Sequence, residues 1–236
     1  MLVTSRSFQE YAAMFDLADA ATAGSVVDCC AGASSFVAEL ATRGGVGIAV
    51  DPVYAKGLDA VRRAAAASLI AGTTIVRDHT DRFVWHWYGS PGQRDRMRAA
   101  AVDRFVEDVT HRPSAYLAGE LPHLPLASAS ADLVLCSHLL FTWADRLDID
   151  WHRAALADLV RVARQEVRVF PLVMQATGAP VPFLDRLIDE LRAQGHEVAV
   201  RDVPYEFQRG AHAMLVIRRR RAASHIEHPN THSGKR

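Results

Sequence analysis

The chain has 236 residues, of which 50% are hydrophobic, and its 27 lysines and arginines balance its 27 aspartates and glutamates. A chain of this length can bury a full core. We therefore predict a single domain over residues 1–218, which contains an insertion, rather than two domains. The zero net charge excludes a strong field toward nucleic acid or an anionic membrane, so neither is an expected partner. The sequence has no apolar run of about 18 residues and no signal-peptide core, which predicts a cytoplasmic protein without a membrane anchor.

The first predicted element is a helix over residues 5–20. Phe8, Tyr11 and Phe15 fall near one helical stripe, and Ser5 or Ser7 is a plausible N-terminal cap. This helix precedes the first strand pattern.

Residues 25–51 carry the pattern around which the rest of the chain is organised. A short apolar run leads through Asp28 into a turn of small residues around Gly32. Apolar residues then recur at helical spacing, and a second apolar run ends on Asp51, nineteen residues after Gly32. A strand, turn, helix and strand with an acid at the second strand tip is typical of a nucleoside site. Small residues let the backbone approach the ligand, and the acid accepts from ribose hydroxyls.

This turn resembles the motif of class I, Rossmann-like S-adenosylmethionine (SAM) dependent methyltransferases, which reads two aliphatic residues and then roughly D-x-G-x-G-x-G. Asp28 and Gly32 match the motif, whereas Cys30 and Ser34 depart from it. A missing third glycine suits SAM better than NAD, because SAM has no pyrophosphate that needs a bare backbone at the helix start. The resemblance implies that residues 31–33 pass the methionine part of SAM and that the acid at the second strand tip binds both ribose hydroxyls.

A helical insertion is predicted between the second and third strands. Residues 57–70 are rich in alanine with an apolar stripe, which fits the crossover helix after the second strand. From residue 78 to 112 there is no strand pattern, and helical patterns over residues 81–88 and 93–111 flank a Gly-Ser-Pro-Gly breaker.

The first part of this insertion is dense in aromatic residues. Trp85, Trp87 and Tyr88 are candidate substrate-binding residues, because aromatic faces offer apolar area with few rotamers and can face a cationic sulfonium or a flat substrate. The alternative is that these side chains form a small hydrophobic core within the insertion itself. For His86 we favour this packing role.

The third strand is predicted over residues 114–118, and it runs into Gly119, Glu120 and Leu121. Related methyltransferases carry a glycine, an acid and a later Leu-Pro pair at this place. The resemblance implies that Glu120 accepts a hydrogen bond from the adenine amino group, while the backbone at Leu121 meets the ring edge.

Residues 131–137 form a continuous apolar strand pattern that opens onto His138. In doubly wound sheets the ligand sits outside the carboxyl ends of the strands, which is where Ser137 and His138 fall. An imidazole can take a proton near neutral pH, so His138 is the candidate general base. Hydrogen bonding to backbone or packing against the cofactor is the alternative.

The remaining elements alternate helix and strand. The resembled family pairs its last two strands as an antiparallel hairpin, which puts the connecting loop beside the pocket mouth. Tyr205, Glu206 and Arg209 in that loop are candidate substrate contacts, and a solvated polar turn is the alternative. The predicted elements are a helix over 150–163, a strand over 166–173, a helix over 180–194, and strands over 196–203 and 214–218.

Two further features are predicted to lack a specific function. Residues 219–236 show no periodicity, which predicts a disordered tail. Cys29, Cys30 and Cys136 fall in strand or strand-end positions, and the adjacent pair lacks CxxC spacing. We therefore expect reduced, buried thiols and no metal site.

Together these patterns predict an α/β fold, a doubly wound and mostly parallel seven-stranded sheet with an antiparallel last strand. The resemblance implies SAM as cofactor and in-line methyl transfer to a small molecule, a reaction that needs mostly alignment. A leading helix in that family often lies over the pocket, which puts Tyr11 near the ligand. The expected cofactor-binding residues are Tyr11, Asp28, Cys30, Ala31, Gly32, Asp51, Pro52, Glu120, Leu121 and Ser137.

Two alternative functions stay open. A SAM- or nucleoside-binding protein without transferase activity fits the altered turn and the absence of an obvious base. An NAD-dependent oxidoreductase requires glycines at Cys30 and Ser34 and gives no reason for Glu120 in its Leu-Pro context. The absence of an Asn-Pro-Pro-Tyr motif and of a basic face favours a small-molecule acceptor, and both a monomer and a homodimer are compatible with the sequence.

Overall fold

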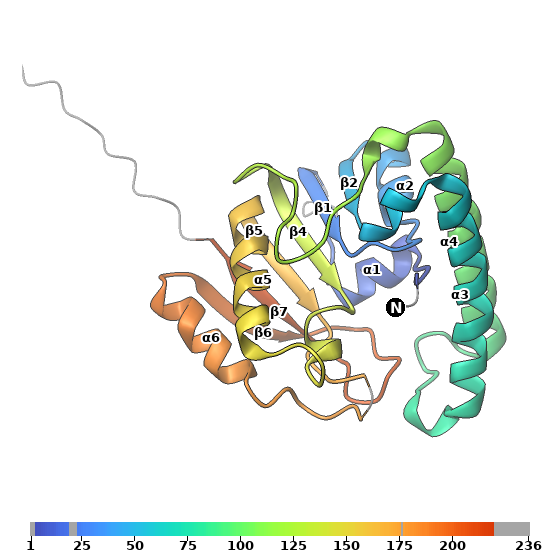
Figure 1. Ribbon diagram of the computed structural model, residues 1–236. Helices are drawn as coiled ribbons and strands as arrows, with labels where there is room; N and C mark the ends of the chain where they lie inside the picture. Colours follow the sequence, from blue (N-terminus) through green and yellow to red (C-terminus); the bar gives the residue numbers. More distant parts are fainter. Residues whose placement is uncertain (1–2, 19–22, 176, 220–236) are drawn as a thin grey trace, which may run out of the picture.

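The computed structural model describes residues 3–18, 23–175 and 177–219, so the predicted tail beyond residue 219 lies outside the described residues. The strands are β1 Ser25–Cys29, β2 Val46–Val50, β3 Tyr116–Leu117, β4 Ala131–Ser137, β5 Ala163–Phe170, β6 Glu197–Asp202 and β7 Ala213–Arg218. They form one seven-stranded sheet in the order β3-β2-β1-β4-β5-β7-β6 (Figure 1). The pairs from β3 to β5 are parallel, and β7 runs antiparallel to both β5 and β6. The predicted α/β fold with an antiparallel last strand is therefore confirmed.

Two hydrophobic cores cover the two faces of the sheet, because successive side chains of a strand point to opposite faces. On β1, Val26 belongs to one core and Val27 to the other, and on β7 Val216 and Ile217 divide in the same way. Of the α-helices in the described residues, four pack in the first core and two in the second. The helices are α1 Phe8–Met14, α2 Phe36–Thr42, α3 Leu58–Asp78 and α4 Pro91–His111 in the first, and α5 Ile149–Val162 and α6 Leu184–Ala193 in the second.

The leading helix is shorter than predicted. Ser7 caps α1 through a capping box, in which its side chain accepts from the Glu10 N–H and the Glu10 carboxylate accepts from the Ser7 N–H. The helix ends at Met14 rather than at residue 20, because Asp16 adopts a left-handed backbone with φ of 46° that a helix cannot contain.

Two long helices join β2 to β3: the crossover helix α3 and, within the insertion predicted over residues 78–112, the helix α4. The prediction of a helix over residues 81–88 is wrong. α3 continues eight residues beyond the predicted end to Asp78, and α4 runs beside it (Figure 1). Between them the chain makes a short 3-10 turn over Thr80–Arg82 and then extends. Phe83 bridges Gln208, and the Val84 N–H donates to Phe207 O at 2.8 Å. Pairing with the loop between β6 and β7 therefore overrides the local helical pattern.

The other element boundaries agree with the predictions to within a few residues, with one shortened strand. β3 spans Tyr116–Leu117 because Pro113–Ala115 form a 3-10 turn. Within the described ranges, no helix combines the length and the apolar character needed to cross a membrane.

Candidate active site

A cavity of about 880 Å³ lies at the carboxyl ends of the parallel strands. Cys30 and Gly32 follow β1, Asp51 follows β2, and Ser137 and His138 stand at the end of β4, and all five line this cavity. The other walls come from the N-terminal segment, the second half of α3, the first turns of α4 and the loop between β6 and β7. This edge of the sheet is where doubly wound folds bind their ligands.

The turn after β1 is held in its conformation from two sides. The Asp51 carboxylate accepts from the Gly32 N–H at 3.0 Å and from the Val53 N–H at 2.9 Å. Gly32 has φ of 59°, and a Cβ there would lie 2.9 Å from Thr4 O, so the N-terminal segment leaves no room for a side chain. Burial raises the pKa of Asp51, although its two backbone donors act in the opposite direction. Asp51 thus links the tip of β2 to the turn that follows β1.

Asp28 and Tyr11 lie behind this turn rather than in the cavity wall. Both are buried, and the Tyr11 hydroxyl donates to Asp28 Oδ1 at 2.9 Å while Oδ2 has no hydrogen-bond partner in the described chain. Burial raises the pKa of Asp28 well above its ordinary value. The Tyr11 ring stacks on Phe36 at 4.7 Å between centroids. These contacts connect α1, β1 and α2.

His138 has an unusual position for a histidine. It adopts φ of 54° directly after β4, its backbone N–H donates to Phe170 O at 2.7 Å, and its Nδ1 lies 2.8 Å from Ser137 Oγ. Burial, followed by the charges of Arg6 and Arg98, lowers the pKa of His138 well below its usual value. The imidazole in this cavity wall is therefore neutral at pH 7.

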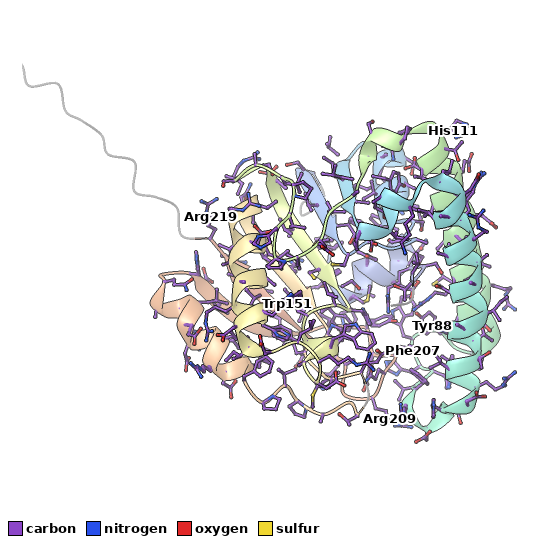
Figure 2. All side chains as sticks on the ribbon, viewed as in Figure 1. Tyr88, His111, Trp151, Phe207, Arg209 and Arg219 are labelled. Atoms are coloured by element: carbon purple, nitrogen blue, oxygen red, sulfur yellow. The ribbon has the colours of Figure 1, made fainter. Side chains whose placement is uncertain are left out.

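The aromatic residues predicted to bind substrate in the insertion pack against the loop between β6 and β7. The ring centroids of Trp85 and Tyr88 lie 5.4 and 5.1 Å from the centroid of Phe207. The ring centroids of Trp87 and Tyr205 are 5.0 Å apart. The hydroxyls of Tyr88 and Tyr205 are 2.9 Å apart. Figure 2 shows Tyr88 and Phe207 close together beside the α3 and α4 pair. Tyr205 lines the cavity, whereas Trp85, Trp87 and Tyr88 form the packed layer next to it.

Several other predicted site residues lie outside the cavity wall. Glu206 accepts from the Gly210 N–H at 2.8 Å, and Arg209 donates to Asp81 O at 2.7 Å, so both side chains hold the loop. Glu120 is exposed, and Leu121 is buried in the second core. The predicted residues outside the wall are Tyr11, Asp28, Ala31, Pro52, Trp85, Trp87, Tyr88, Glu120, Leu121, Glu206 and Arg209.

Three buried arginines that were not predicted from the sequence line the same cavity. Arg6, Arg94 and Arg98 are 7%, 6% and 6% exposed, and the Nε of each has no partner in the described residues. Arg98 Nη2 lies 2.9 Å from Glu10 Oε1, and Arg94 Nη1 lies 2.6 Å from Asp95 Oδ1. Arg6 forms no ion pair with any described residue.

The three cysteines form a cluster beside the turn. Cys29 pairs in register with Cys136, and the sulfurs of Cys29, Cys30 and Cys136 lie within 4.8 Å of one another. All three are free thiols, and the Cys29 and Cys30 sulfurs are 3.7 Å apart. Three soft donors at this spacing could hold a thiophilic ion. The sequence spacing of the adjacent pair gave no sign of this, because the third thiol comes from a neighbouring strand.

Comparisons with known proteins found one relative in sequence and several similar structures. No family model matches the chain. An uncharacterized protein of Methanocaldococcus jannaschii is 24% identical over 219 residues, covering 92% of this chain and 96% of that protein. The structure of 1,6-didemethyltoxoflavin-N1-methyltransferase from Burkholderia thailandensis, with bound 1,6-didemethyltoxoflavin and S-adenosylhomocysteine, aligns with a TM-score of 0.50 and 13% identity. This alignment covers 90% of this chain and 78% of the Burkholderia chain.

A second structure, a SAM-dependent methyltransferase and possible histamine N-methyltransferase of Thermotoga maritima, has 16% identity and a TM-score of 0.45. The alignment covers 91% of this chain and 90% of that chain. Together with the strand order, the Burkholderia comparison shows that this chain has the fold of class I SAM-dependent methyltransferases.

Proposed function

We propose that this protein is a SAM-dependent methyltransferase that acts on a small molecule. The observation that carries the proposal is Asp51, which stands at the tip of β2, lines the cavity and is tied to the turn after β1. In this fold that position is suited to a ribose, because a carboxylate can accept from two adjacent hydroxyls.

The cavity residues fit the proposed cofactor. Each carboxylate oxygen of Asp51 accepts one backbone N–H, and each keeps a further lone pair for a ribose hydroxyl. Arg6 is a buried cation without an ion pair among the described residues, and the methionyl carboxylate of SAM supplies the missing charge. The volume of about 880 Å³ is near the upper end of the usual range for small-molecule sites, so cofactor and acceptor can share it.

The predicted adenine contacts remain part of the proposal. Val50 pairs with Leu117, so the chain that follows β3 leaves the sheet beside Asp51. This segment, where Glu120 carries an exposed carboxylate, would hold the adenine of a nucleoside whose ribose is bound at Asp51. A carboxylate there recognises the adenine amino group as a hydrogen-bond donor.

The chemistry requires mainly alignment. SAM supplies an electrophilic methyl group, and about 7–11 kcal/mol of a barrier can come from positioning two reactants. His138 is neutral and lines the cavity, so it can accept a proton from an acceptor hydroxyl or amine. That role requires the tautomer in which Nδ1–H donates to Ser137 Oγ and Nε2 is the free acceptor.

The test is calorimetric titration of the purified protein with SAM, S-adenosylhomocysteine and NAD. We expect micromolar binding of the first two, no binding of NAD, and at least a tenfold loss of SAM affinity in Asp51→Ala. Asp103→Ala is the matched control, because Asp103 is exposed on α4 away from the cavity wall. Thermal unfolding of each variant is needed as well, since Asp51→Ala leaves two backbone N–H groups without their carboxylate.

The outcomes separate the candidate functions. Absence of SAM binding in a folded wild-type protein refutes the proposal, and NAD binding in its place supports the oxidoreductase alternative. If SAM binds, transfer of a radiolabelled methyl group to members of a small-molecule acceptor library distinguishes a transferase from a binding protein.

A further inference from the structure

The buried polar atoms that lack a partner gather around the cavity. The described chain has five such side-chain atoms, and four of them belong to cavity-lining residues, namely Arg6, Arg94, Arg98 and Thr142. A buried donor without a partner is unfavourable, so a cluster of them at one cavity indicates a polar ligand. Three of the four atoms are guanidinium nitrogens, which only donate. A ligand that lies against these guanidinium groups is complementary to them when it carries acceptors.

Arg94 and Arg98 are the two buried arginines of the cavity wall that the proposed cofactor does not use. They stand one helical turn apart on α4, and both are more than nine-tenths buried. Burial and the nearby charge of Arg98 lower the pKa of Arg94, as expected for two close cations. Their carboxylate partners, Asp95 and Glu10, engage one terminal nitrogen of each guanidinium. Arg98 Nη2 also donates to the Tyr88 hydroxyl oxygen at 3.2 Å, and the Nε of each arginine has no hydrogen-bond partner among the described residues.

Aromatic rings share the cavity wall with these cations, and the carboxylate in that wall beside Arg94 is Asp95, which is paired with it. Phe83, Trp143 and Phe207 line the cavity with them, and the Arg94 guanidinium carbon lies 5.3 Å from the centroid of the Phe207 ring. The neutral imidazole of His138 adds no competing charge at pH 7. A ligand that fits this region combines an anionic group with an apolar or aromatic body.

We infer that Arg94 and Arg98 form a carboxylate-binding subsite and that the methyl acceptor is a carboxylic acid with an apolar or aromatic body. That the bound carboxylic acid is the methyl acceptor rests on the proposed function, whereas the subsite itself rests on the residues described above. A carboxylate matches the planar fork of a guanidinium with two parallel hydrogen bonds. The subsite belongs to the α3 and α4 insertion, outside the turn and strand tips that the fold uses for its cofactor.

The test compares two probes of the same shape. Binding of 2-naphthoate and of the neutral 2-naphthamide is measured by their fluorescence in wild type, Arg94→Gln, Arg94→Lys and Arg96→Gln. Arg94 is the residue to change, because removing Arg98 strands the buried Glu10 carboxylate. Arg96→Gln is the matched control, since Arg96 is exposed on the same helix. We expect naphthoate to bind at least tenfold more tightly than naphthamide.

In Arg94→Gln this preference should fall at least tenfold. Arg94→Lys should keep part of it because the charge remains, and Arg96→Gln should keep all of it. Equal affinity for the two probes in wild type, or an unchanged preference in folded Arg94→Gln, overturns the subsite. Because SAM binding is measured separately, SAM binding without anion preference refutes this inference alone. Anion preference without SAM binding refutes the proposed function and leaves the subsite.

Discussion

The buried pair of Glu10 and Arg98 offers the sharpest test of how the insertion is held to the body of the protein. Glu10 is fully buried on α1, and its carboxylate accepts from the Ser7 N–H at 2.8 Å, from Arg98 at 2.9 Å and from the Tyr88 hydroxyl. Arg98 also donates to the Tyr88 hydroxyl oxygen at 3.2 Å. Glu10→Gln keeps the size of the side chain but removes its charge, so Arg98 is left buried without a counter-ion.

The expected effect is large. Removing one member of a buried ion pair typically lowers the free energy of unfolding by about 3–5 kcal/mol. In a domain of about 150–250 residues each kcal/mol shifts Tm by about 2–4 °C, so Tm should fall by roughly 6–20 °C. The cause is the uncompensated Arg98 charge, because the amide oxygen of the substituted side chain can still accept from Ser7 or Tyr88.

A double-mutant cycle measured by urea denaturation separates this cause from lost packing. Glu10→Gln/Arg98→Met contains no unpaired buried charge, and it should regain at least half of the stability that Glu10→Gln loses. Asp189→Asn is the comparison for an ion pair in water. Asp189 Oδ1 lies 3.5 Å from Arg192 Nη1, and both side chains are exposed. The free energy of unfolding should therefore change by no more than about 0.5 kcal/mol.

Two results would refute this reasoning. A Glu10→Gln variant as stable as Asp189→Asn would mean that Arg98 finds another anion or reaches water. A double variant destabilised by the sum of its single changes would mean that packing, and not the charge pair, connects α1 to α4.

Two more predictions concern the cavity wall. Gly32→Ala should lower the free energy of unfolding by about 1–3 kcal/mol and weaken SAM binding, because φ is 59° and the new Cβ meets Thr4 backbone at 2.9 Å. Gly44→Ala, with positive φ but open space, should cost about 1 kcal/mol and leave SAM binding unchanged in the same melting and calorimetry experiments. For His138, the folded-state pKa lies below the unfolded value of about 6.5, so its contribution to stability is present above that pH and is lost as the pH falls toward the folded pKa. His138→Gln should therefore show a shallower loss of stability than wild type below pH 6.5, by at most about 1.4 kcal/mol per pH unit, and parallel pH profiles would contradict the prediction.

Most of the fold could be predicted because local patterns and the core agree. The apolar run over residues 131–137 became β4 with the same bounds, since a strand buried on both faces reads as a continuous hydrophobic segment. The unit from residue 25 to Asp51 was also clear, because its turn and its acid serve the same site and stand in fixed order. Such features depend on residues close together in the sequence.

The parts that were missed depend on distant residues. The segment over residues 81–88 is extended because Phe83 and Val84 pair with a loop more than 120 residues later, which no local periodicity reports. The third thiol of the cysteine cluster reaches the adjacent pair through the register of β1 and β4. The dense aromatic composition was noticed, but the partners of the rings were not predictable from their own segment.

The arginines of α4 left a signal in the sequence itself. Ala101 and Phe105 are buried on the inward face of α4, and Arg94 and Arg98 continue their stripe toward the helix N-terminus at spacings of three and four. A solvated arginine belongs on the opposite face of an amphipathic helix. A cation in line with the apolar stripe must be paired inside the protein or must face a cavity. In α4 both conditions hold, because Arg98 has a buried carboxylate partner and both arginines line the cavity wall. A charge at core spacing therefore predicts an internal pair or a cavity, and the two are told apart by the fold: Asp108, on the same stripe, pairs with Arg112 and Tyr116 away from the cavity.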